Sequence, residues 1–354
     1  HRLENYEKVA QYSRADVRFY NIHAIQAQQL ILRHPPERFA DLFGQPAPHI
    51  AIYGFGRLGQ QVFAEAIRLC QYLPGVPPRF TIVDRDAQKV GRVLEQEFPE
   101  IARRTAYAEQ VAIVHDVIQV TVSPPALNDT VLWRILNRRF PVTQHVICFG
   151  EETDAVALGL ALRDQLLERQ GANAPIFVRT KRAHGMAALL DSNSGQREIP
   201  DGLYPFATLE TALDPRALDN GWVEAVAQVL HEYAYLRENT GEEAVRPADK
   251  TWEQLDDLHR RGTRYAVLHT DAKLRALGLK RFPLPDRALY WAPAGLKQVF
   301  SGGEGGSRPA TAAAEPLPDL EHRRYVAARL ADGWQQADDR ADPLRRHKVF
   351  VPYD

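Results

Sequence analysis

The chain has 354 residues, of which 45% are hydrophobic and 25% charged, the composition of an ordinary soluble globular protein. This length predicts two or three domains, with enough residues for a buried core. Its 44 Lys and Arg residues balance 45 Asp and Glu residues, so no overall basic charge attracts nucleic acid, and we expect no nucleic-acid partner.

No stretch approaches the roughly 20 apolar residues that a membrane span requires, which predicts a cytoplasmic protein or the cytoplasmic part of a membrane-anchored one. The two cysteines, Cys70 and Cys148, lie in apolar stretches. We expect both to be buried free thiols in a reducing compartment, and we expect no metal site.

Residues 1–47 are interpreted as a helical linker that leads into the first domain. Apolar residues recur at helical spacing from Val17 to Phe39, which predicts an amphipathic helix that Pro35 and Pro36 end.

The segment from Ile50 to Asp84 carries the strongest functional signal. An apolar run, IAIY, leads directly into GFGRLG, and an apolar helical stretch then leads to a second strand, FTIVD. This order is typical of a dinucleotide-binding unit, in which Gly54 allows a tight turn, Gly56 lets the backbone approach a pyrophosphate and Gly59 lets the helix pack against the strand. Asp84 then lies where it accepts hydrogen bonds from a ribose.

The rest of the motif supplies further candidate contacts. Phe55, Arg57 and Leu58 complete the glycine loop, and we expect Arg57 to contact a phosphate. Asp84 favours a ribose without a 2′-phosphate, as in NAD, ADP-ribose or ATP, although Arg85 beside it weakens that inference. The alternative is a Rossmann-like unit whose glycines make a tight turn and whose site is empty.

Strand and helix patterns alternate through residues 48–195, which predicts a Rossmann-like doubly wound parallel sheet with its ligand at the carboxyl ends of the strands. The expected strands after the second are Val111–Thr121, His145–Phe149 and Pro175–Thr180. The expected helices are Ala87–Phe98, Asp129–Arg139, Asp154–Glu168 and His184–Leu190.

A polar segment, Asp191–Gly202, marks the predicted domain boundary. Residues 200–300 are predicted to form a mainly helical domain, and 301–318 a flexible linker rich in Gly, Ser, Pro and Ala. Residues 319–354 then hold a helical pattern, EHRRYVAARLADGW, and a strand-like VFVPY. The expected helices of the second domain are Ala207–Leu213, Gly221–Arg237, Thr251–Arg261 and Asp271–Leu277.

The first domain resembles the NAD-binding lobe of Trk-type (RCK) regulators of potassium transport. The matching stretches are GFGRLG, IVDRD, CFGEETDAVALGLALR and PIFVRTKRAHGMAAL. The resemblance implies a lobe that binds a nucleotide as a signal, that forms a homodimer or a larger homo-oligomer, and that belongs to a channel-like or transport assembly whose membrane portion would precede this segment.

The second domain resembles the ryanodine-receptor-type (RyR) domain that some bacterial proteins carry behind such a lobe. The matching stretches are LHEY, WEQL and HTDAKLRALG, and a second partial copy is interpreted from LEHRRYVAARLADGW onward.

A second ligand site is a further hypothesis for these helices. Indole rings stack on bases, and cationic side chains hold phosphates, although aromatic residues at helical spacing more often belong to a core. The candidates are Trp252, Arg264, Lys273, His322, Arg329 and Trp334.

A catalytic role requires a proton donor or acceptor, and the first-domain candidates are His115, His145 and His184. None lies in a catalytic motif, and GxSxG, HExxH and GxxxxGK[ST] do not occur. We therefore expect a non-catalytic nucleotide sensor. An NAD-dependent oxidoreductase and a plain interaction module are the alternatives.

Overall fold

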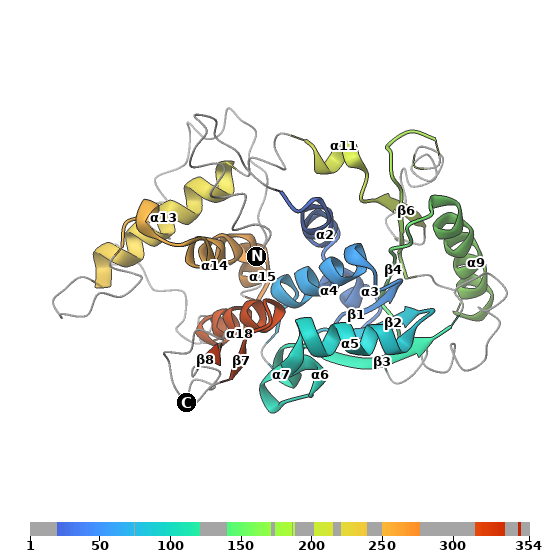
Figure 1. Cartoon of the computed structure of the whole chain (residues 1–354), viewed down its shortest axis with the longest axis horizontal. Coiled ribbons are helices and arrows are strands. Elements are labelled where there is room, and N and C mark those ends of the chain that lie inside the picture. Colours follow the sequence, from blue (N-terminus) through green and yellow to red (C-terminus); the bar gives the residue numbers. More distant parts are fainter. Residues whose placement is uncertain are drawn as a thin grey trace.

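The computed structural model describes residues 20–73, 75–120, 140–170, 174–185, 187, 202–214, 221–238, 250–276, 316–336 and 346–347. A six-stranded sheet with helices on both faces forms its centre (Figure 1). All neighbouring strands are parallel, in the order β3-β2-β1-β4-β5-β6. The strands are β1 (His49–Tyr53), β2 (Arg79–Asp84), β3 (Ile113–Gln119), β4 (Gln144–Ile147), β5 (Ile176–Arg179) and β6 (Leu203–Phe206).

This strand order is that of the doubly wound Rossmann fold, so the predicted α/β class is confirmed. The chain reverses its direction across the sheet between β1 and β4, where Tyr53 lies opposite Ile147. In such sheets, the chain segments that follow the two neighbouring strands leave toward opposite faces of the sheet. Their separation opens a crevice at the carboxyl ends of the strands.

Successive residues of β1 face opposite sides of the sheet. Ile50 and Ile52 belong to the hydrophobic cluster on one face, and Ala51 and Tyr53 to the cluster on the other. Because both faces are covered, the strand is buried throughout and is apolar after His49, which explains why its sequence reads as an unbroken apolar run from Ile50 to Tyr53.

The first face carries α4 (Arg57–Leu69) and α5 (Ala87–Glu97), and the second carries α9 (Glu152–Gln170). Asp86 caps α5, since its carboxylate accepts a hydrogen bond from the Lys89 backbone N–H. Two short helices that the sequence analysis did not predict precede β3: α6 (Pro99–Ala102) and α7 (Ala106–Val111).

The helix predicted to end at Pro35 and Pro36 does end there, but the pattern through Phe39 continues as a second helix that was not predicted. α2 (Ile22–Arg33) ends before His34, and α3 (Pro36–Leu42) begins with Pro36 at its first position. Proline suits the first position of a helix, because the N–H of that residue has no partner within the helix. Two prolines in the interior of a helix break it. α2 packs against α4, so this segment is part of the α/β domain instead of a linker.

The sheet extends past the expected domain boundary, since β6 lies beyond residue 200. It pairs with β5 in parallel and is followed by α11 (Leu209–Ala212). Gln26 of α2 donates a hydrogen bond to the Ala207 carbonyl oxygen at 2.6 Å. This bond ties the first helix to the end of β6.

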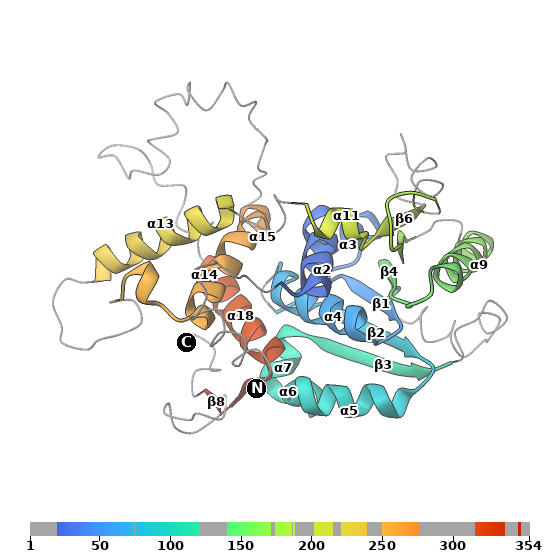
Figure 2. The same cartoon turned by 45° about the horizontal axis from the view of Figure 1, so that its top comes forward.

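The remaining helices lie together beside α4 (Figure 2). They are α13 (Gly221–Glu238), the 3-10 turn η3 (Trp252–Gln254), α14 (Asp257–Leu268), α15 (Thr270–Ala276) and α18 (Pro316–Ala331). α13, η3 and α14 share a small core that includes Val223, Ala227 and Trp252. We call α13, η3, α14, α15 and α18 the helical module.

The helical module joins the main core through α18, which packs against α4, α6, α7, α14 and α15. Gly333, just after α18, has φ of 77°, and a Cβ built there lies 3.1 Å from the Glu97 carbonyl oxygen, so only glycine fits the approach without a shift. A two-residue strand β7 (Gln335–Gln336) then pairs in parallel with β8 (Arg346–His347).

Several predicted segments lie outside the described residues. They are the helix Asp129–Arg139, most of the helix His184–Leu190, nearly all of the linker 301–318 and the strand VFVPY. Among the helices that the structure describes, none combines the length and the apolar character needed to cross a lipid bilayer.

Candidate functional site

The turn between β1 and α4 depends on two glycines that touch each other. Gly54 has φ of 87°, a region that other residues rarely adopt, and its N–H bonds to the Val83 carbonyl oxygen at 2.8 Å. A Cβ built on Gly59 would lie only 2.1 Å from the Gly54 carbonyl oxygen. Both glycines are therefore required by the fold itself, as their predicted roles in the turn and in helix packing imply.

Gly56 differs from these two glycines. Its φ is −73°, which any residue adopts, and a Cβ built there has no atom within 4 Å. Gly56 is the N-cap of α4 and offers no side chain to the first N–H groups of the helix. The fold therefore does not require glycine at this position, which is open to the outside and lies at the positive end of the helix dipole.

Asp84 lies at the carboxyl end of β2 and is fixed by backbone bonds. Its Oδ2 accepts the Phe55 N–H at 2.7 Å, and its Oδ1 accepts the Asp86 N–H at 3.0 Å. A carboxylate has about four acceptor positions, so two remain for another donor. Asp84 therefore holds the glycine turn in place and still has capacity for a ribose diol.

A cavity of about 530 Å³ opens at these residues, at the carboxyl ends of β1, β2 and β4. This is the crevice that the strand order predicts as the ligand site. Four carboxylates and two cations line it, together with glycine backbone and two phenylalanine rings. The lining includes Gly54, Phe55, Gly56, Asp84, Arg85, Asp86, Lys89, Cys148, Phe149, Gly150, Glu151 and Asp154.

The cavity includes five of the eight residues predicted for the nucleotide site: Gly54, Phe55, Gly56, Asp84 and Arg85. The other three do not line it. The Leu58 side chain is buried in the core, Gly59 packs against Gly54, and Arg57 is exposed beside the turn.

Arg85 and Lys89 are the two cations of the cavity, and both are exposed. Neither forms an ion pair with a described residue, so both are available to a phosphate. Lys89 was not predicted from the sequence. Its place on the first turn of α5, beside Asp84, follows only once the β2–α5 turn is positioned.

The wall formed after β4 was also missed. Phe149, Gly150, Glu151 and Asp154 lie there, and Arg179 of β5 donates to the Phe149 carbonyl oxygen at 3.3 Å. The signal was present in the sequence, because the stretch CFGEE follows the strand that the Rossmann order places next to β1.

Titratable groups near the sheet are held in their neutral forms. Burial raises the pKa of the Cys148 thiol to about 12, so the one thiol of the cavity carries its proton at neutral pH. Burial lowers the pKa of His145 to about 3, and its Nδ1 lies 3.0 Å from the Tyr53 hydroxyl.

None of the three histidines considered for catalysis lines this cavity. His145 is buried inside the sheet, His115 lies beside His49 with ring centres 5.4 Å apart, and His184 is exposed after β5.

The six residues proposed for a second ligand site lie in two groups. Trp252 and Arg264 share Glu224 of α13, since the indole N–H donates to Oε1 at 3.1 Å and the guanidinium binds both oxygens. The Arg264 hydrogen bond lowers the pKa of Glu224. These residues join α13, η3 and α14 to one another.

The other four candidates lie on or beside α18. Lys273 forms an ion pair of 2.6 Å with Glu321, and the guanidinium of Arg329 lies 4.7 Å from the centre of the Trp334 ring. His322 follows Glu321 on the same helix. The described contacts of Lys273 and Arg329 are those of packing between helices, and a second ligand site at the six residues stays a prediction.

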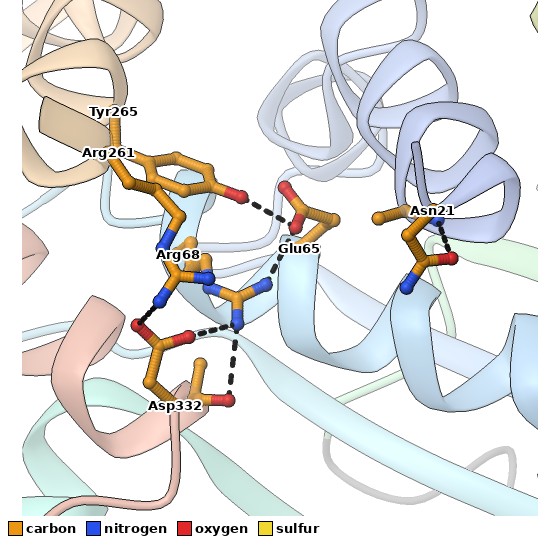
Figure 3. A network of polar contacts seen from close by, with 8 residues as sticks. Asn21, Glu65, Arg68, Arg261, Tyr265 and Asp332 are labelled. Atoms are coloured by element: carbon orange, nitrogen blue, oxygen red, sulfur yellow. Dashed lines mark hydrogen bonds and ion pairs between the residues drawn. The ribbon is translucent and has the colours of Figure 1, made fainter. Parts of the chain in front are cut away.

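A buried polar network connects α4 to the helical module (Figure 3). On α4, the Glu65 carboxylate is 1% exposed and accepts from Arg68 at 2.6 Å and from the Tyr265 hydroxyl of α14 at 2.7 Å. Arg68 also donates to the Asp332 carboxylate at 2.7 Å, and Asp332 binds Arg261 of α14 at 3.0 Å. The helix that begins at the glycine turn is thus tied to α14 and to the end of α18.

We compared the chain with protein-family models, with curated proteins and with solved structures, and none of the three comparisons found a match.

Proposed function

We propose that this chain is a nucleotide-sensing regulatory region, in which the cavity beside Gly56 and Asp84 binds an adenine nucleotide without chemical change. The observation that carries the proposal is the open position at Gly56. Gly56 stands at the amino end of α4, and the fold does not require glycine there. A pyrophosphate bound at this helix end does require glycine, because a side chain would occupy its place.

The lining favours a nucleotide with an unmodified ribose. Asp84 is oriented by two backbone bonds and presents its remaining acceptor positions to a diol, while a 2′-phosphate would meet its negative charge. Arg85 and Lys89 supply cations for the phosphates. NAD, ADP-ribose and ATP all meet these requirements.

A signal from this cavity has a direct path to the helical module. The nucleotide would bind at the first turn of α4, and Glu65 and Arg68 on the later turns of the same helix hold Tyr265 and Asp332. A ligand that favours one position of α4 would shift the equilibrium between two arrangements of the module in proportion to its differential affinity.

The resemblance to Trk-type nucleotide lobes and RyR-type domains supports a regulatory role in a channel-like or transport assembly, with the chain acting as a homodimer or larger homo-oligomer. The competing proposal is an NAD-dependent oxidoreductase. The placement of His115, His145 and His184 away from the cavity favours the sensor.

The test is a thermal-shift series with NAD, ADP-ribose and ATP on the whole chain. A ligand at about 100 times its Kd stabilises the folded state by about 2.7 kcal/mol, so at least one nucleotide should raise the melting temperature of the native chain. Gly56→Ala should fold normally and lose this shift, because its methyl group occupies the space that a pyrophosphate needs.

Gly91→Ala is the matched control, since a Cβ at Gly91 on α5 also has no atom within 4 Å but lies away from the cavity lining. Asp84→Asn should weaken binding by about tenfold, because its amide nitrogen cannot accept a backbone N–H or a ribose hydroxyl as the carboxylate oxygen does. An equal shift in the native chain and in Gly56→Ala would refute the assigned site.

A further inference from the structure

A second cavity, of about 580 Å³, lies between α4, α14 and the segment after α18. It is separate from the nucleotide cavity, and the two share no lining residue. Ala64, Phe98, Leu258 and Trp334 supply apolar surface, so part of any ligand held here is apolar.

Four charged side chains line this cavity: Arg68 and Asp332, which pair with each other, and Arg261 and Glu97, which do not. Arg261 of α14 is exposed and gives one N–H to Asp332 at 3.0 Å, while its other N–H groups bond to no described residue. Glu97, at the end of α5, is exposed and forms no ion pair with a described residue. The lining thus offers one group for an anion and one for a cation.

Further polar capacity lies between these charges. The Gln61 side chain lines the cavity, forms no hydrogen bond with a described residue and has both donors and an acceptor. Nε of Arg68, a side chain that is 9% exposed, is buried without a hydrogen-bond partner and belongs to the same lining.

We propose that this cavity binds a free amino acid with an apolar side chain. Its carboxylate pairs with Arg261, its ammonium group pairs with Glu97, and its side chain packs against Leu258 and Trp334. A neutral apolar compound leaves both charges unused, and an anion alone leaves Glu97 unpaired.

The second cavity is also connected to the first. Gln60 lines the second cavity, and its side-chain amide donates at 3.0 Å to the carbonyl oxygen of Phe55, a residue of the glycine turn. An amino acid that moves Gln60 therefore acts on the nucleotide site. This coupling, unlike the amino-acid site itself, rests on the proposed nucleotide function, and it is reciprocal by thermodynamic linkage.

The experiment is calorimetric titration of the whole chain with L-leucine. We expect saturable binding at one site per chain. N-acetyl-L-leucine, which lacks the ammonium charge, and L-leucinamide, which lacks the carboxylate, should each bind at least about tenfold more weakly, since each loses one charged hydrogen bond. Equal affinity of all three compounds would overturn the assignment of the two charges.

Substitutions of two exposed residues test which protein groups bind the amino acid. Glu97→Gln and Arg261→Gln should each weaken L-leucine by about tenfold or more, whereas Glu95→Gln on α5 and Arg260→Gln on α14 should leave the affinity unchanged, because neither control residue lines the cavity. A loss of the same size in the controls would overturn the proposal.

The two proposals fail separately. Gly56→Ala should keep full L-leucine affinity, because Gly56 is not part of the second cavity. Absence of L-leucine binding in a chain that still binds a nucleotide would overturn this inference alone. Nucleotide affinity that stays the same with and without saturating L-leucine would overturn the coupling through Gln60.

Discussion

Gly56 and Gly59 stand three residues apart in one motif, but their surroundings differ. Gly59 faces the Gly54 carbonyl oxygen inside the protein, and Gly56 faces open space. The fold therefore requires glycine at position 59 and not at position 56.

The first prediction concerns Gly59. Gly59→Ala places a methyl group 2.1 Å from the Gly54 carbonyl oxygen, so α4 must move away from β1, and we expect a loss of about 3 kcal/mol in the free energy of unfolding. Urea denaturation measures the loss. Gly91→Ala, in the open interior of α5, should instead gain up to about 1 kcal/mol from helix propensity. Similar stabilities of the two variants would contradict the packing role.

At this scale the sequence was informative because the chemistry is local. Gly54, Gly56 and Asp84 are fixed by the strand, turn and strand that contain them, so their places could be predicted. Arg57 does not line the cavity. The motif places it on the helix but does not set the direction in which its side chain leaves the helix axis. Phe149 was missed because it reaches the cavity through strand order.

At the scale of elements, α4 connects two parts of the molecule. Its N-cap, Gly56, lines the cavity at the carboxyl ends of the strands, and Glu65 and Arg68 on its later turns bind residues of α14 and the end of α18. In the sequence, Glu65 and Arg68 resemble an exposed pair three residues apart on a helix, which would contribute little to stability. The structure buries the pair.

The second prediction follows from this burial. Arg68→Met leaves the Glu65 carboxylate, which is 1% exposed, without its guanidinium, and we expect a loss of about 3–5 kcal/mol in the free energy of unfolding. Arg92→Met on the exposed side of α5 should change it by less than about 0.5 kcal/mol.

The double variant Glu65→Leu with Arg68→Met should recover part of the loss, because no buried charge is then left unpaired on α4. Additive effects in this cycle would contradict a network in which the two charges depend on each other.

β6 is a strand that was not predicted from the sequence. Its sequence, LYPF, is four residues long and contains Pro205, which argues against a central strand. Proline is tolerated because β6 is an edge strand, paired with β5 alone. Only the position in the sheet, which the sequence does not state, makes the segment a strand.

At the scale of the whole molecule, buried neutral histidines predict sensitivity to acid. Burial lowers the pKa from 6.5 to about 4 in His34 and His49, and to about 3 in His145 and His269. In the unfolded chain each would take up a proton near pH 6.5. The unfolded state therefore binds more protons than the folded state below that pH, and folded-state stability falls as the pH falls.

The third prediction is the size of this effect. Between about pH 6.5 and 4.5 the free energy of unfolding should fall with a slope that approaches about 1.4 kcal/mol per pH unit for each such histidine. His269→Gln removes one proton site, and its amide still reaches the Gln71 carbonyl oxygen that His269 binds at 2.8 Å. Denaturation curves across this range should show a shallower slope for the variant, and an unchanged slope would contradict the assignment.

One part of the whole-molecule arrangement follows from the alternation of strands and helices in the sequence, and the other part depends on tertiary contacts. The alternation of strands and helices around GFGRLG predicted a parallel sheet with its ligand at the carboxyl ends. The packing of α18 on α4 could not be predicted, since Arg68 and Asp332 are brought together by tertiary contacts across 264 positions of sequence separation.

NADH fluorescence tests the central claim, that a nucleotide binds at the amino end of α4 and is not consumed, most directly. Titrating the whole chain into NADH should give a saturable change in fluorescence that ADP-ribose or ATP reverses. The NADH should remain reduced over prolonged incubation with a panel of carbonyl compounds, which an NAD-dependent oxidoreductase would reduce. The account would be contradicted by no saturable change with NADH together with no thermal shift from ADP-ribose or ATP, or by steady oxidation of NADH that depends on one of the carbonyl compounds.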